Sequence, residues 1–116
     1  MQINHVSPAP IASARKKSTR EQNISAGMQW GGNAWQTRPA DRVNIAGRAA
    51  KLNSLVTLGR AQLTDSSYTD ASGQLRPLVW RTADDQNIAF TIQTFLEFAI
   101  AVDEFVEQKY FESWGV

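Results

Sequence analysis

The chain has 116 residues, 42% of them hydrophobic and 20% charged, and this composition predicts one soluble globular domain with a single core. The absence of cysteine excludes disulfides and thiolate metal sites, and the single histidine, His5, excludes a histidine-based zinc site. The net charge of +1 argues against a protein whose whole surface binds nucleic acid. No run approaches the roughly 18 apolar residues of a membrane span, and the first residues lack the pattern of a secretory signal.

Residues 1–23 are predicted to form a basic N-terminal arm or short helix, ahead of a single domain over residues 24–116. Pro8 and Pro10 favour an extended lead-in to about residue 11, because each proline removes a backbone donor and biases its predecessor away from helix. Residues 12–23 have fair helix propensity but a thin apolar face. Four cations there are candidate contacts for nucleic acid or an acidic neighbour: Arg15, Lys16, Lys17 and Arg20. We prefer the simpler interpretation of a solvated arm whose charges maintain solubility.

Residues 28–36 are predicted to form a short antiparallel hairpin. The Gly-Gly-Asn cluster at 31–33 can supply the positive φ that a tight turn requires. Trp30 and Trp35 would lie on or near a cross-strand pair, where large rings stabilise a ribbon too short to persist alone. Both tryptophans are also candidate contacts for a partner protein.

A long helix is predicted to begin at Thr37 or Arg38 as cap, with Pro39 in its first turn, and to run to about Gln62. Asp41 in the first turn is favoured by the helix dipole. Its apolar and small residues have the alternating spacing of a heptad seam: Ile45, Ala49, Leu52, Val56, Gly59 and Leu63. We prefer packing of this stripe on the chain's own sheet. The alternative is contact with other copies of the chain, which the small residues would allow to approach closely.

Residues 64–77 are rich in Asp, Ser and Gly and are predicted to form an exposed loop. A second hairpin is predicted with strands at 79–82 and 88–90. Asp84 and Asp85 in its turn do not predict a metal site, because a calcium loop needs more oxygen ligands at a defined spacing.

Trp80, Arg81 and Asp84 have two interpretations. In the structural one, which we prefer, Trp80 fills the core under the last helix, while Arg81 and Asp84 pair across the turn or bond to nearby backbone. In the functional one they form a recognition patch, since Trp and Arg are enriched among interface anchors.

The last helix is predicted to begin at a Thr91 cap and to end at Gly115, with Trp114 folded back on it. Its residues at intervals of three and four form one apolar stripe: Ile92, Phe95, Leu96, Ala99, Val102, Val106 and Tyr110. Three further aromatic residues, Phe98, Phe105 and Phe111, exceed what one small sheet would cover, so Phe98 and Phe105 are candidate contacts for a partner. The charged residues in 97–116 are acidic except for Lys109, so the two ends of the chain could attract each other.

A hairpin followed by a helix thus occurs twice. The predicted fold class is α+β, with a small antiparallel sheet from two tryptophan-bearing β-hairpins, each followed by an α-helix, and an N-terminal extended arm. A four-stranded or split sheet covered on one face by two helices is the simplest packing that buries both apolar stripes.

Several of these segments together resemble a known family. They are Ala26-Gly27-Met28-Gln29-Trp30-Gly31-Gly32, Trp35, Asn44-Ile45-Ala46-Gly47, Val79-Trp80-Arg81-Thr82-Ala83-Asp84 and Thr91. From about residue 20 to 112 the chain is similar to an uncharacterised domain of tailed-bacteriophage and prophage proteins, commonly the C-terminal part of tail-fibre, tail-assembly or other virion-associated proteins. The resemblance implies a phage tail context but no mechanism. Asp85 departs from the usual pattern, in which Asn is more common.

The sequence predicts neither catalytic residues nor a cofactor. A Ser, His and acid cannot converge with a lone histidine in the N-terminal arm, and neither a phosphate-binding glycine loop nor a carboxylate pair on a cleft-facing element is evident. The first hypothesis is a non-enzymatic structural or adaptor protein of the phage tail, made in the host cytoplasm, homo-oligomeric and bound to other virion subunits. The second is a tail-fibre assembly chaperone absent from the mature particle, and the third is a small nucleic-acid binder acting through its basic arm.

Overall fold

The computed structural model describes the backbone of residues 8–116 and the side chains from residue 14 onward. The described residues form three helices and six short strands. In chain order these are α1 (Pro8–Ser25), β1 (Met28–Trp30), β2 (Asn33–Trp35), α2 (Pro39–Thr57), β3 (Ser67–Thr69), β4 (Leu75–Pro77), β5 (Val79–Arg81), β6 (Asn87–Ala89) and α3 (Ile92–Trp114). The α+β class is confirmed, as are the two tryptophan-bearing hairpins and the helix that follows each.

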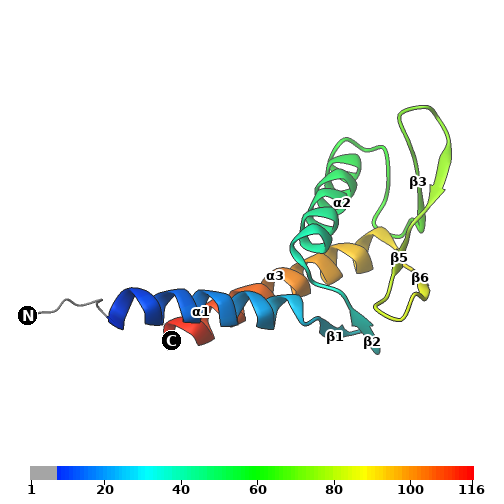
Figure 1. The fold of residues 1–116 in the computed structure, drawn as a ribbon. Coiled ribbons are helices and arrows are strands. Elements are labelled where there is room, and N and C mark those ends of the chain that lie inside the picture. Colours follow the sequence, from blue (N-terminus) through cyan, green and yellow to red (C-terminus); the bar gives the residue numbers. More distant parts are fainter. Residues whose placement is uncertain (1–7) are drawn as a thin grey trace, which may run out of the picture.

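The molecule has a head and a long projection (Figure 1). The α2 helix and the β5–β6 hairpin lie at the first part of α3, the β3–β4 hairpin extends away from α3 on the side of α2, and α1 runs beside the last part of α3 (Figure 1). The Cα radius of gyration is 19.2 Å, while a compact chain of this length has about 13 Å. We call α1 together with residues 103–114 the stalk, and the remainder the head.

The N-terminal segment is more regular than the sequence suggested. The extended lead-in to about residue 11 was wrong from Pro8 onward, because α1 begins there. Proline is tolerated in a first helical turn, where its missing donor has no intrahelical partner to lose. The part of the predicted arm before Pro8 lies outside the described residues, and the predicted boundary between residues 23 and 24 stays a prediction.

The strands form three separate two-stranded antiparallel ladders, so the expectation of one four-stranded sheet was wrong, and the two predicted hairpins lie in separate sheets as in the split alternative. The third ladder, β3–β4, lies where the sequence predicted a loop. Leu78 joins it to the next ladder, because its N–H donates to Ser66 and its carbonyl accepts from Phe90, both at 2.9 Å. The chain from β3 to β6 is therefore a bent ribbon of two hairpins instead of half of a layered sheet.

An aromatic cluster holds the head together. Trp35 is 2% exposed and its ring centroid lies 4.6 Å from that of Phe98, which is fully buried. Phe90, which directly follows β6, lies 5.3 Å from Phe95 and 5.7 Å from Trp35. Edge and tilted contacts of this kind add to the stabilisation from burial. The cluster thus connects the first hairpin, the third hairpin and α3, which share no ladder.

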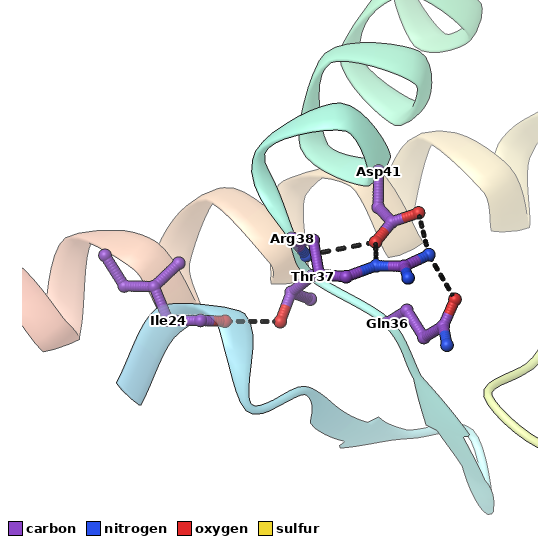
Figure 2. Close-up of polar contacts among 5 residues, drawn as sticks. All are labelled: Ile24, Gln36, Thr37, Arg38 and Asp41. Atoms are coloured by element: carbon purple, nitrogen blue, oxygen red, sulfur yellow. Dashed lines mark hydrogen bonds and ion pairs between the residues drawn. The ribbon is translucent and has the colours of Figure 1, made fainter. Parts of the chain in front are cut away.

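A buried hydrogen bond joins the stalk to the head (Figure 2). Thr37, with no exposed surface, donates its hydroxyl to the carbonyl of Ile24 at the end of α1. The next residue, Arg38, caps α2: its N–H donates to the carboxylate of Asp41 at 3.0 Å, and its Nε does so at 2.7 Å. The predicted start of α2 and the first-turn role of Asp41 are confirmed. Two adjacent residues therefore fix where α1 ends and where α2 begins.

The α2 helix ends at Thr57, five residues before the predicted end near Gln62. Gly59 has a φ of +73°, and beyond it the N–H of Arg60 donates to the carbonyl of Leu55 at 2.8 Å. This is a glycine-terminated helix end, in which a left-handed residue satisfies the last carbonyls. The heptad interpretation of Gly59 was therefore wrong, because the glycine stops the helix instead of continuing its seam.

The apolar stripes pack against each other. Ile45, Leu52 and Leu55 of α2 are buried, and this helix packs chiefly on α3, while its Arg48 and Lys51 also contact Tyr68 of β3. In α3, the Thr91 hydroxyl accepts from the N–H of Thr94 at 3.1 Å, and Gly115 adopts a φ of +76°, so both predicted ends are confirmed. The preferred prediction was that α2 packs on the chain's own sheet. The helix does pack within its own chain, but chiefly on α3.

Replacing Phe98 with Ala is expected to lower the free energy of unfolding by about 3 to 5 kcal/mol, because it leaves a cavity in the aromatic cluster. Ile100, on the same helix, is 58% exposed, so Ile100→Ala should change stability by less than about 1 kcal/mol. Urea unfolding followed by tryptophan fluorescence measures both. Equal effects of the two substitutions would contradict the assignment of the cluster as the core.

Two glycines give opposite predictions for the same substitution. A Cβ on Gly27, whose φ is +99°, would lie 2.9 Å from the carbonyl oxygen of Trp35, so Gly27→Ala should destabilise the first hairpin. A Cβ on Gly47, inside α2, meets nothing within 4 Å, so Gly47→Ala should raise stability by up to about 1 kcal/mol through helix propensity. Thermal unfolding of the two variants gives the sign of each change.

Candidate interaction surfaces

The predicted basic residues separate into two groups. Arg15, Lys16 and Lys17 are exposed on α1. Arg20 is half-buried: its guanidinium lies 4.1 Å from the ring centroid of Tyr110 and donates to the hydroxyl of Ser113 at 3.2 Å. The first three are free to meet a partner, whereas Arg20 already links α1 to α3.

The predicted aromatic contacts divide in the same way. Trp35 and Phe98 are buried in the aromatic cluster, so the chain's own core takes them up and they are not available to a partner. Trp35 also donates its ring N–H to the carbonyl of Trp30 at 2.8 Å, across a register that pairs Trp35 with Met28. Trp30 is half-buried against Phe98. Of the four predicted contacts, only Trp30 and Phe105 keep some exposed surface.

Phe105 lines a pocket of about 540 Å³ between α3 and the first hairpin. The ammonium of Lys109 lies 5.4 Å from its ring centroid. Met28 and Trp35 contribute to the opposite wall, and Ala83 connects the hairpins there by donating its N–H to the carbonyl of Ala34 at 2.9 Å. This pocket sits where the stalk meets the head.

Trp80 is half-buried and packs edge-on against Phe95, with centroids 5.1 Å apart. It is therefore at the border of the core under α3. Its outer side shares a pocket of about 480 Å³ with Gly47, Arg48 and Lys51 of α2. The guanidinium of Arg48 lies 5.9 Å from the Trp80 centroid and also donates to the hydroxyl of Tyr68.

The predicted pairing of Arg81 with Asp84 is not present. Arg81 donates to the side chain of Asn87 at 3.2 Å, across the ladder rather than across the turn. Thr82, which is buried, closes the turn by donating its N–H to Gln86 at 2.8 Å and accepting one back on its hydroxyl at 3.0 Å. A buried threonine therefore fixes this turn, and Asp84 is exposed.

A groove between α2 and α3 was not predicted as a site. Two adjoining hollows of about 310 and 510 Å³ share Ala46, Ala99 and Asp103. Exposed apolar residues flank them: Val43 is 72% exposed and Ile100 is 58% exposed. The sequence did carry a signal for this groove, because α2 has a second face of small and apolar residues beside the heptad positions. We call this surface the α2–α3 groove.

The far part of the stalk exposes aromatic side chains. Trp114 is 61% exposed and Phe111 is 38% exposed. Trp114 is the last residue of α3, and its ring lies 5.5 Å from that of Tyr110 and 6.0 Å from that of Phe111, its neighbours one turn earlier on the helix. The three rings form a contiguous patch, which we call the stalk aromatic patch.

Asp70 organises the β3–β4 turn. Its carboxylate accepts from the Ser72 hydroxyl at 2.7 Å, from Arg76 at 2.9 Å and from the N–H of Gln74 at 2.9 Å. These bonds, above all those from Ser72 and Arg76, hold the pKa of Asp70 well below its usual range. The hydrogen bond from Arg38 likewise lowers the pKa of Asp41. Both carboxylates are thus structural acceptors.

A scan against protein families matches residues 9–116 to the family described as "Domain of unknown function (DUF4376)". The chain belongs to this family. The matched range takes in nearly all of α1 and everything that follows it, so stalk and head lie within one family match. No curated protein and no solved structure matches the chain.

Among the residues of the DUF4376 chain that the structure describes, no three acidic or histidine side chains lie close enough together to hold a metal ion. Within the same residues, none of the helices has the length and apolar character to span a membrane. The candidate surfaces are the α2–α3 groove, the stalk, the Phe105 pocket and the Trp80 pocket.

Asp70→Asn is expected to lower the melting temperature at neutral pH, because a neutral amide cannot accept the same charge-assisted bonds. A carboxyl whose pKa is depressed on folding stabilises the protein above its unfolded pKa, about 4, and loses that contribution as the pH falls below it. The difference between wild type and variant should therefore shrink below pH 4. Ser72→Ala, which removes the first of the bonds, should show a smaller shift with the same pH trend. A difference that grows on acidification would contradict this assignment.

Proposed function

We propose that this chain is a non-enzymatic structural or adaptor protein of a phage tail, which binds another virion subunit in its α2–α3 groove. The phage context is supported by the resemblance of the segment from Val79 to Asp84, and of the first hairpin, to a domain of tailed-phage proteins. The observation that carries the binding role is the groove itself, an apolar surface left open between two helices.

The groove has the character of a protein-binding site. Four of its lining residues are alanines, Ala46, Ala49, Ala50 and Ala99, so a partner helix can approach both backbones closely, and the exposed Val43 and Ile100 extend its apolar lining. Asp103 and Arg42 lie in one part of it and offer polar contacts at the edge. An apolar centre with a polar rim is the usual composition of such a surface. A helix laid into a groove is a common mode of recognition.

The same surfaces would serve a tail-fibre assembly chaperone, which differs in leaving before the particle is complete. The composition of purified particles separates the two roles. A structural or adaptor protein is present in fixed proportion to the tail subunits, whereas a chaperone is nearly absent.

A nucleic-acid binder is favoured by one observation, the exposed Arg15, Lys16 and Lys17 on α1. Binding through these cations would weaken steeply as salt is added and would be lost when residues 1–23 are removed. If the affinity of the intact chain for nucleic acid did not change with added salt, this role would be excluded.

Ala46→Glu should remove the chain from purified particles, because the carboxylate would enter the shared centre of the groove. The expected loss, measured by mass spectrometry relative to the other tail proteins, is about tenfold or more, which corresponds to about 1.4 kcal/mol of binding free energy. The matched control is Ser54→Glu, an exposed position on α2 outside the groove, which should be incorporated normally.

Absence of the wild-type chain from particles would contradict the structural role and support the chaperone. Normal incorporation of a folded Ala46→Glu chain would contradict the groove as the binding site. Circular dichroism of both variants confirms that each has folded.

A further inference from the structure

The stalk is a thin two-helix structure. Among the described α1 side chains, residues 14–25, only Ile24 is buried, and it lies at the end nearest the head. Farther along, the contact to α3 depends on Arg20, which rests on Tyr110 and bonds to Ser113. A helix that is polar on nearly all sides gains little from tertiary packing, and in water such a helix is marginal.

The apolar side of the stalk is not covered by α1. Phe111 and Trp114 remain 38% and 61% exposed, although α1 lies beside the same stretch of α3 (Figure 1). Clustered exposed aromatic side chains on a projecting helix mark a contact surface, because single scattered residues would not form a continuous patch.

The charges of the two stalk helices are opposite and largely unused. The exposed cations Arg15, Lys16 and Lys17 on α1 form no ion pair with a described residue. On α3, Glu104 and Glu107 are exposed and equally without an ion pair among the described side chains. The stalk thus carries exposed positive charge on α1 and exposed negative charge on α3, and no ion pair among the described side chains joins these residues.

We propose that the stalk pairs with the stalk of a second copy of this chain, each α1 lying against the partner copy's α3. A two-fold arrangement of four helices can place α1 beside the other copy's α3 twice over, so the cations of each α1 meet the acidic residues of a partner α3. The same arrangement turns the aromatic patches of both copies toward the centre of the bundle, where they are buried. This inference is independent of the proposed adaptor role, since the α2–α3 groove lies in the head.

Complementary charge reversal tests the pairing. One variant carries Lys16→Glu and Lys17→Glu, and the other carries Glu104→Lys and Glu107→Lys. Each alone should associate about tenfold or more weakly than wild type, because like charges then face each other at both contacts. An equimolar mixture of the two should recover association, since one contact is restored with reversed signs and the other is unchanged. Sedimentation equilibrium measures all three samples.

The aromatic patch supplies a second measurement that does not depend on charge. Phe111→Ser with Trp114→Ser should also dissociate the copies, and both positions are exposed enough to leave the head folded. Leu75→Ser, at a residue 66% exposed on β4, is the matched control and should leave association unchanged.

A wild-type chain that sediments as a monomer at its highest soluble concentration would overturn the proposal. So would an oligomer that persists in both the charge-reversed and the aromatic variants, or a mixture of the reversed chains that stays dissociated. Loss of particle incorporation in Ala46→Glu with unchanged self-association would show that groove and stalk act separately.

Discussion

The head depends on contact among five aromatic rings. Three ladders of three-residue strands share no hydrogen-bonded edge, and an isolated two-stranded ribbon of that length does not persist in water. Trp30 and Trp35 from the first hairpin, Phe90 after the third, and Phe95 and Phe98 of α3 meet in one cluster. The cluster therefore does for this fold what a continuous sheet does for most α+β domains, and α3 connects the first hairpin, the third hairpin and α2.

The stalk is stabilised in a different way. Its attachment is local, through the buried bond from Thr37 to Ile24 and the ion pair of Arg42 with Glu21 at 3.2 Å. Beyond that joint the two helices share mainly the contact of Arg20 with Tyr110. The fold thus combines a head that has an aromatic core with a projection whose α1 buries only Ile24 among its described side chains, which is a reason to expect a further partner for the projection.

Much of the fold could be predicted because local signals agreed with the packing. Thr91, Gly115 and the apolar stripe of α3 each have a mechanism that acts within a few residues, and the structure confirms them. The two tryptophan hairpins were predictable for the same reason: Gly31 and Gly32 both have the positive φ that a two-residue turn requires.

The sequence-based predictions that were wrong concern residue types that can serve two purposes. Gly59 fits a heptad seam as a small residue, but its positive φ ends the helix. The β3–β4 ladder was missed because its turn carries the composition of a loop, and only the bonds gathered by Asp70 close it. The candidate site was harder to predict from the sequence than the fold. Trp35 and Phe98 were selected as large aromatic residues, but burial depends on the whole fold and not on residue type. The α2–α3 groove requires knowledge of which helices pack together.

The shortness of the ladders has a consequence for how copies of this chain can meet. A long exposed strand edge invites another strand to add to it, and this is how many β proteins aggregate or polymerise. Here no ladder strand in the described chain exceeds three residues, and Pro77 removes one donor from β4. Edge-to-edge growth into fibrils is thereby disfavoured, so side-chain surfaces rather than open backbone would set how copies of this chain meet.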